Sequence, residues 1–230
     1  MTPLLVLAFG FHPVTAVGTD LLFASATKSV RTIVHGQGGT VGWQVVRRLA
    51  TGSVPMTVVT LLLLAAFGTG LTGVQHAITV TLGVALIGTA VAMLFRRRIT
   101  ARFTRSLYAL SDPQIRALTI LLGGVLGVLV SLSSVGAGAL GMTALLILYP
   151  HLPTSRLVGS DIAHAVPLTL IAGAGHWVMG SVDVDLLASL LVGSVPGIVI
   201  GSLISTRVPE RALQPILAGA LALVGGKLIF

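Results

Sequence analysis

Long uncharged apolar runs, separated by short polar stretches, make up most of this chain. A helix needs about 20 apolar residues to cross the hydrocarbon core of a bilayer. The runs are continuous rather than alternating, which predicts membrane helices and argues against a β-barrel. We therefore predict an all-α, polytopic membrane helix bundle. After a short apolar stretch at 1–10, the expected segments are 14–35, 44–67, 74–95, 117–134, 137–149, 154–179, 185–206 and 212–229.

One apolar run, residues 117–149, is too long for a single crossing and is interrupted by small residues at 132–142. Glycines let helix ends approach closely, and the first N–H groups of a helix have no partners within it. Such a helix start attracts anions, and irregular backbone at membrane depth lines a cavity or is covered by protein. The alternative is a hinge or a close-packing contact. We predict a break that contacts substrate through Ser133, Ser134, Gly136, Ala137, Gly138 and Ala139.

The two halves of the chain repeat one another at a constant offset. Residues 1–55 align without a gap on 142–196, with seventeen identities that include Gly-Ser-Val-Pro at 52–55 and 193–196. This predicts two homologous transmembrane repeats, 1–95 and 117–230, joined by an arginine-rich linker at 96–116. Since Met1 aligns with Met142, just after the break, we expect the first repeat to have its own break and helix in roughly 20–30 residues upstream of residue 1.

The arginines favour an inverted arrangement of the two repeats. With five segments in each half, eleven loop arginines fall on one side of the membrane, and the other side has only Asp183 and Asp185. Four segments in each half would divide the same arginines eight to three. Because positive loop residues mark the cytoplasmic side, we predict oppositely oriented repeats with the linker in the cytoplasm. The run 117–149 then forms a hairpin, spanning or re-entrant, that returns to the side it left.

Composition agrees with a membrane protein and narrows the function. The chain is 54% hydrophobic and only 9% charged, with a mean hydropathy of +1.02, whereas soluble domains carry about 25% charged residues. The net charge of +8 lies in short loops, so it indicates membrane orientation rather than a nucleic-acid partner. There is no cysteine, no nucleotide-binding or hydrolase motif and no metal-ligand spacing. We expect no enzyme activity, no metal and no cofactor.

Two aspartates occupy matched positions early in long apolar segments. Thr19-Asp20 aligns with Ser160-Asp161 in the repeat, and each pair comes directly after a glycine. An ionisable group in a membrane helix is costly to leave in lipid and so indicates a functional site. The alternative is that each pair caps a helix broken beside Gly18 or Gly159. We include both pairs in the predicted substrate site.

Basic residues follow the first aspartate along the same segment. Lys28 lies eight residues after Asp20, on the edge of the same helix face and in the inner half of the membrane. We predict that Lys28 meets an anionic substrate, and the second repeat has no cation at the matching place. Arg31 and His35 are expected to reach the inner headgroups.

Two histidines of the second repeat have different expected roles. His164 follows Asp161 by three residues, so the pair could relay protons if transport is proton-coupled. His176 matches His35 and is expected at the membrane interface.

The motifs together resemble the sulfite exporter TauE/SafE family. The first half reads MTPLL, TAVGTDLLFASATKSV, HGQGGTV and GSVP in order, and the second reads SSVGAGALGMTALLILYP, LVGSDIAHAVP and GSVPG. The resemblance implies a bacterial-type, multi-pass inner-membrane permease for sulfite, sulfoacetate or related organosulfur anions. Its matching positions are the break at 136–139, the pairs Thr19-Asp20 and Ser160-Asp161, and Lys28.

We therefore predict a secondary transporter for a small anion, with an anion channel or a non-transporting membrane subunit as the alternatives. The expected partners are the anion and the lipid bilayer. The oligomeric state stays open, a homodimer included.

Overall fold

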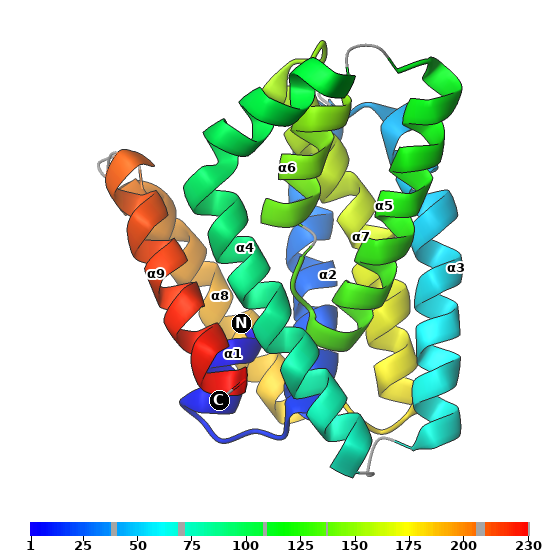
Figure 1. Cartoon of the computed structure of the whole chain (residues 1–230). Coiled ribbons are helices and arrows are strands. Elements are labelled where there is room, and N and C mark those ends of the chain that lie inside the picture. The colour runs from blue at the N-terminus through cyan, green and yellow to red at the C-terminus, as the bar shows by residue number, and fades with distance from the viewer. Residues whose placement is uncertain (38–40, 69–71, 108–109, 137, 206–209, 230) are drawn as a thin grey trace.

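The computed structural model describes residues 1–37, 41–68, 72–107, 110–136, 138–205 and 210–229, and all regular structure within them is helical (Figure 1). The predicted contact residue Ala137 lies outside these ranges. The helices are α1 (Thr2–Leu7), α2 (Pro13–Gln37), α3 (Trp43–Phe67), α4 (Thr72–Leu107), α5 (Asp112–Ser133), α6 (Ala139–Leu148), α7 (Thr154–Val178), α8 (Val184–Ser205) and α9 (Glu210–Ile229).

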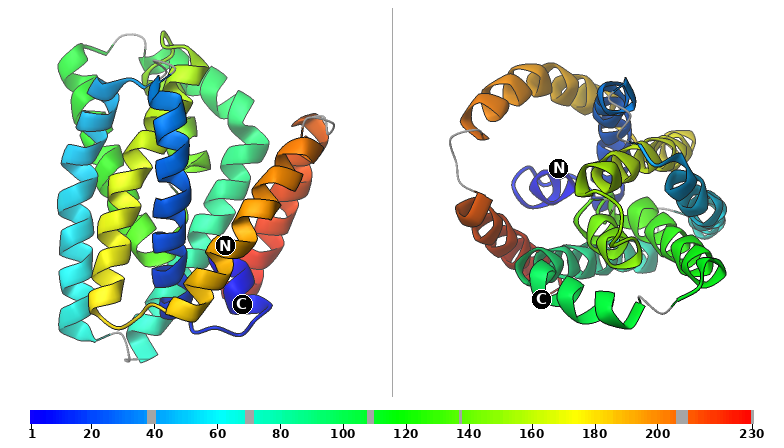
Figure 2. Two further views of the ribbon diagram at one scale, coloured as in Figure 1. Left: turned by 180° about the vertical axis from the view of Figure 1, so that it is seen from behind. Right: turned by 90° about the horizontal axis from the view of Figure 1, so that it is seen from above.

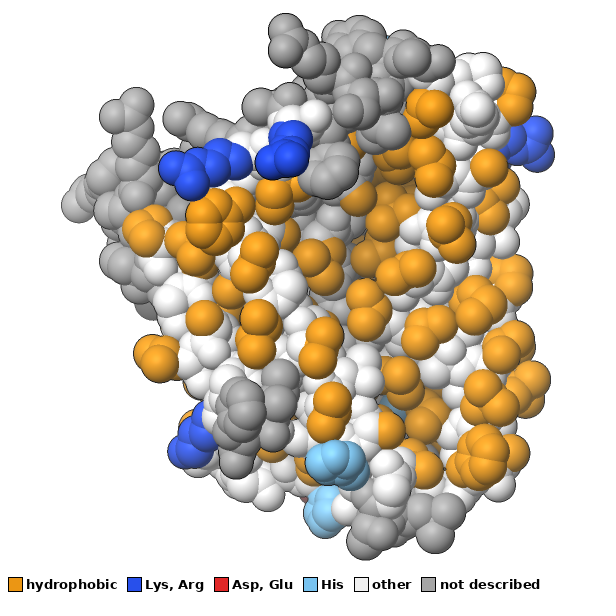
Figure 3. Space-filling model, viewed as in Figure 1, with side chains coloured by type: hydrophobic (Ala, Val, Ile, Leu, Met, Phe, Trp, Pro, Cys, Tyr) orange, Lys and Arg blue, Asp and Glu red, His pale blue; other side chains and the backbone are white. Residues whose placement is uncertain are grey.

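Length and apolar surface identify a multi-pass membrane protein. In the described part of the chain, four helical stretches are long and apolar enough to cross a bilayer: Trp43–Phe67, Gly73–Arg96, Asp112–Ser133 and Thr154–Val178. Apolar side chains such as Leu62, Leu121 and Leu170 face outward, as lipid contact requires. In the space-filling view, an apolar band lies between basic side chains at the upper end and the lower end, which carries histidines and one further basic side chain (Figure 3).

The predicted linker differs from the observed structure. Helix α4 does not end with its apolar residues near Phe95 but continues through the arginines to Leu107. Arginine and leucine are good helix formers, and no proline interrupts the stretch, so the hydrogen-bonded ladder extends beyond the apolar part. Helix α5 then begins at Asp112 with a capping box formed by Ser111 and Gln114.

The helices reproduce the repeat found in the sequence. The first residues of α2 and α7 (13 and 154) and their last residues (37 and 178) are separated by the repeat offset. The first residues of α3 and α8 (43 and 184) are separated by the same offset. Helix α2 packs on α7 and α4 packs on α9, so each of these helices contacts its own repeat counterpart. In Figure 1, α2 ascends whereas α7 descends.

Two hydrogen bonds between the halves are also related by the same offset. The N–H of Gly42 donates to Ser160 Oγ at 2.8 Å, and the N–H of Asp183 donates to Thr19 Oγ1 at 3.0 Å. Gly42 matches Asp183, and Thr19 matches Ser160. Each half therefore donates one backbone N–H to a hydroxyl of the other half at matched positions.

Glycines allow α3 and α5 to touch backbone to backbone. A Cβ on Gly52 would collide with the carbonyl oxygen of Ile120, and a Cβ on Gly127 would lie 2.6 Å from that of Ser53. Gly193, the counterpart of Gly52, has no such neighbour within 4 Å. Gly52 is therefore a tight packing position in α3, whereas Gly193 is an open one in α8. Figure 2, seen from above, shows α8 beginning beside α2 and α9 lying against α4.

The long apolar run is a re-entrant hairpin. Helix α6 has ten residues and therefore rises about 15 Å, half of the hydrocarbon thickness. It begins about halfway along the bundle and ends at the same end at which α5 begins (Figure 1). Helix α6 alone is therefore too short for the spanning version of the predicted hairpin, and its half-length agrees with the re-entrant version.

Candidate functional site

The break between α5 and α6 is built by residues with positive φ. Helix α5 ends at Ser133, and Ser134 takes the left-handed conformation with φ of 57°. Gly136 and Gly138 follow with φ of 119° and 156°, which side chains with a Cβ rarely adopt. Ser133 Oγ accepts the N–H of Val135 at 3.2 Å and so ties the first turn of the break. The chain thus reverses direction and begins α6 at Ala139.

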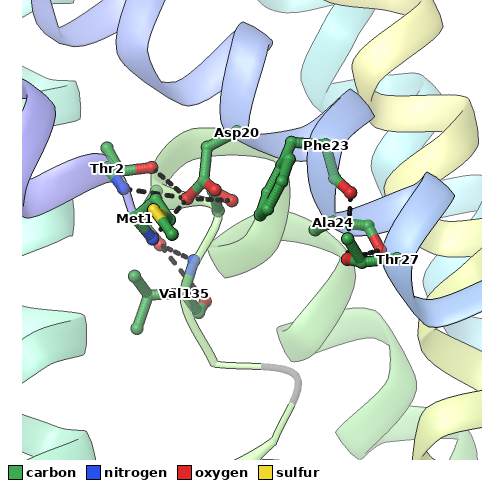
Figure 4. Close-up of polar contacts among 9 residues, drawn as sticks. Met1, Thr2, Asp20, Phe23, Ala24, Thr27 and Val135 are labelled. Atoms are coloured by element: carbon green, nitrogen blue, oxygen red, sulfur yellow. Dashed lines mark hydrogen bonds and ion pairs between the residues drawn. The ribbon is translucent and has the colours of Figure 1, made fainter. Parts of the chain in front are cut away.

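Asp20 joins three segments at this break (Figure 4). Its side chain is buried, and Oδ2 accepts hydrogen bonds from Thr2 Oγ1 at 2.6 Å, the Thr2 N–H at 2.9 Å and Ser134 Oγ at 3.1 Å. The amino group of Met1 lies 3.0 Å from the same oxygen. Asp20 therefore binds the start of α1 and the α5–α6 break together.

Asp161, its counterpart, has a different environment. It is 5% exposed, yet Oδ1 finds no hydrogen-bond partner among the described residues. This oxygen lies against α6, where a Cβ on Gly141 would come within 2.6 Å of it. Both aspartates sit inside continuous helices, α2 and α7. The alternative that they cap breaks beside Gly18 and Gly159 is therefore wrong.

A chamber of about 260 Å³ lies next to the start of α6. This is large enough for a small ion and several waters, since one water takes about 30 Å³ of liquid volume. Arg96 of α4 and Asp161 of α7 are its charged residues, and Gly138 and Ala139 bring the first turn of α6 to its wall. The remaining lining residues are Met93, Met142, Thr143 and Val158.

A buried polar group extends from the chamber towards α3. His164 is fully buried, and its Nε2 lies 2.8 Å from Ser53 Oγ, while Nδ1 has no partner in the described part of the chain. Lys28 of α2 acts electrostatically on both Asp161 and His164. Lys28, from the first repeat, is therefore near enough to influence two residues of the second, although it is not among the described residues that line the chamber.

Other predicted residues have structural contacts instead. The hydroxyls of Thr19 and Ser160 accept the inter-repeat hydrogen bonds described above, and neither lines the chamber. His176 is fully buried, with Nε2 3.0 Å from the carbonyl oxygen of Ser131, so its predicted place at the interface is wrong. A helix end inside a bundle is covered by its neighbours, which sequence position alone does not reveal. The side chains of Arg31 and His35 lie outside the described part.

Four polar residues at the site were not selected from the sequence: Thr2, Ser53, Arg96 and Thr143. Three of them lie in segments that are identical in the two repeats. These segments are Met-Thr at 1–2 and 142–143 and Gly-Ser-Val-Pro at 52–55. Arg96 was assigned to the linker because it follows the apolar run. Only the continuation of α4 places it in the chamber wall. Within the described residues, no three His, Asp or Glu side chains gather as a metal site would need.

Membrane-length helices around a re-entrant break, with buried carboxylates and a small charged chamber, define a multi-pass membrane protein with a polar interior site. The chain belongs to the sulfite exporter TauE/SafE family, whose model matches residues 1–228, and is accordingly a member of a membrane transporter family. It is 37% identical over 230 residues to the probable membrane transporter protein YjnA of Bacillus subtilis (strain 168), a match that covers all of this chain and 90% of that protein. No solved structure matches the chain significantly.

Proposed function

We propose that this protein is a secondary transporter of a small oxyanion, sulfite or a related organosulfur anion. One observation carries the proposal: α6 starts about halfway along the bundle, and its first residues line a chamber that Arg96 also lines. Amides at a helix start and a guanidinium are the groups that bind oxyanions in proteins. Interrupted helices that point their ends at a substrate near the midplane recur in secondary transporters.

The two repeats would supply the movement. Opposite directions of α2 and α7, together with the reciprocal bonds of Gly42 with Ser160 and of Asp183 with Thr19, support an inverted repeat. An inverted repeat has two related conformations, in which one half rocks against the other and opens the site to alternate sides. Lys28 of the first repeat acts on Asp161 and His164 of the second, so relative movement of the halves would change the charge around the anion.

The arginine-bearing end would face the cytoplasm. Arg48 and Arg156 lie near the starts of α3 and α7, which are at the top of Figure 1, and Asp183 and Asp185 lie at the start of α8, at the opposite end. Under the positive-inside rule this places the linker region in the cytoplasm and the protein in a bacterial-type plasma membrane.

Transport is tested by counterflow of ³⁵S-labelled sulfite in proteoliposomes. The wild-type protein should show saturable uptake driven by unlabelled sulfite inside, and a channel would show neither saturation nor counterflow. Gly138→Ala should lower the rate about tenfold or more, because a Cβ strains the backbone that starts α6.

Gly180→Ala is the matched control. Gly180 also has positive φ, 70°, with nothing within 4 Å of an added Cβ, but it lies in the α7–α8 turn. Equal transport rates for the two variants at equal protein abundance would rule out the α6 start as the anion site.

A further inference from the structure

The strongest unexplained feature of the molecule is the free carboxylate oxygen of Asp161. Its repeat counterpart Asp20 is equally buried, but there Oδ2 accepts at least three hydrogen bonds. Burying a polar oxygen without a partner costs free energy, so it persists in a native fold where it has a use. Asp161 also lines the chamber, so its carboxyl group lies beside whatever occupies that space.

The same chamber attracts negative charge. Arg96 lines it from α4, and the start of the ten-residue helix α6 lines it from the other side. An oxyanion held by these two features would also lie close to Asp161. Two negatively charged oxygens cannot stay in contact at a buried site unless a proton lies between them.

The charges around Asp161 indicate which charge states of the ligand and of the carboxyl group would be electrically balanced. The charged and titratable groups facing it are Arg96 on α4, Lys28 on α2 and His164 on its own helix, and α6 carries no titratable side chain. With His164 neutral, Arg96 and Lys28 supply two positive charges. A divalent oxyanion plus a carboxyl group that holds one proton balances them, as does a hydrogen-bearing monoanion beside an ionised Asp161.

We propose that the Arg96–Asp161 chamber binds a divalent oxyanion together with one proton, which the ligand and the Asp161 carboxyl group share. Arg96 supplies the charge that holds the anion, and Asp161 selects ligands that bring, or can accept, a hydrogen. The inference rests on the proposed anion transport and specifies its site and ligand class. Transport through this site would carry the proton with the anion.

The test is calorimetric binding of sulfate to the purified protein in buffers of different ionisation heat. Sulfate stays fully charged near neutral pH, so any proton that accompanies it must reside on the protein. We expect uptake of about one proton per sulfate, and about tenfold weaker binding of methanesulfonate, which has the same tetrahedral shape but one charge fewer. This comparison needs no variant. No sulfate binding, binding without proton uptake, or equal affinity for the two ligands would overturn the proposal.

Three variants locate the groups. Asp161→Asn should bind sulfate with no accompanying proton, and Arg96→Gln should lose about tenfold or more in affinity, with Arg96→Lys restoring part of it. Arg98→Gln is the control, because Arg98 is exposed over the Phe95 ring, two residues from Arg96, and should bind sulfate as the wild type does. Proton uptake that survives in Asp161→Asn, or affinity that survives in Arg96→Gln, would place the ligand elsewhere.

The outcomes separate this inference from the proposed function. Proton-linked sulfate binding without sulfite counterflow would leave the chamber assignment intact and contradict transport. Sulfite counterflow, together with sulfate binding that takes up no proton and does not depend on Arg96, would support transport. It would contradict the assignment of the anion to the chamber.

Discussion

At the scale of single residues, hydrogen-bond partners distinguish the structural polar groups from the candidate functional ones. Thr19 and Ser160 have hydroxyls that bond across the repeats, and Asp20 is fully occupied by donors. Asp161 Oδ1 and His164 Nδ1 are buried without partners in the described structure. Matched positions in the sequence predicted where the two aspartates lie. Their difference could not be predicted, because it depends on how α1 and α6 start beside them.

Ser53 is expected to be needed for packing around His164. Ser53→Ala removes the hydroxyl 2.8 Å from Nε2 and leaves that nitrogen buried without a partner, at a cost of about 1–2 kcal/mol in unfolding free energy. Ser194, its counterpart, donates only to the carbonyl oxygen of Leu191 in its own helix, so Ser194→Ala should cost less than about 0.5 kcal/mol. Denaturant unfolding in mixed micelles compares the two. A loss of the same size in both variants would contradict the role of the Ser53–His164 pair.

At the scale of elements, the α5–α6 break is the feature that the sequence predicted best. Serines and glycines in an overlong apolar run predicted its position. Glycine readily adopts the positive φ observed at Gly136 and Gly138, and Ser134 also takes the left-handed conformation. The end of α4 was placed wrongly, because the apolar pattern stops at the membrane surface while helical hydrogen bonding continues to Leu107. Arg96 was missed for the same reason.

The glycines of α3 and α8 should respond differently to the same substitution. Gly52→Ala puts a Cβ against the carbonyl oxygen of Ile120, which must force α3 and α5 apart and lower stability by about 1–3 kcal/mol. Gly193→Ala meets nothing within 4 Å and should leave stability unchanged or raise it by up to about 1 kcal/mol, since alanine is the better helix former. Unfolding of both variants under one condition is the measurement. A Gly52→Ala protein as stable as the wild type would contradict the close α3–α5 contact.

At the scale of the whole molecule, the constant offset between the halves predicted two units, and the helix ends reproduce it. The opposite directions of the units were inferred from the arginines. Which helices contact their own counterparts, α2 with α7 and α4 with α9, could not be read from the sequence, because spacing along the chain does not define lateral neighbours.

Labelling from outside the cell tests the proposed orientation. The chain has no cysteine, so one introduced cysteine reports its own position. Asp185→Cys, exposed at the end of the molecule opposite the arginines, should react with a membrane-impermeant maleimide in intact cells. His151→Cys, exposed at the arginine-bearing end, should react only after permeabilisation. The reverse pattern would contradict the positive-inside assignment.

The most direct test of the central claim locates a bound anion. Selenite has the shape and charge of sulfite, and selenium gives an anomalous X-ray signal, so a crystal of the protein soaked in selenite would show where an oxyanion resides. The account predicts one peak in the chamber, between Arg96 and the first turn of α6 at Gly138 and Ala139. A peak elsewhere in the bundle, with that chamber empty of selenium, would contradict it.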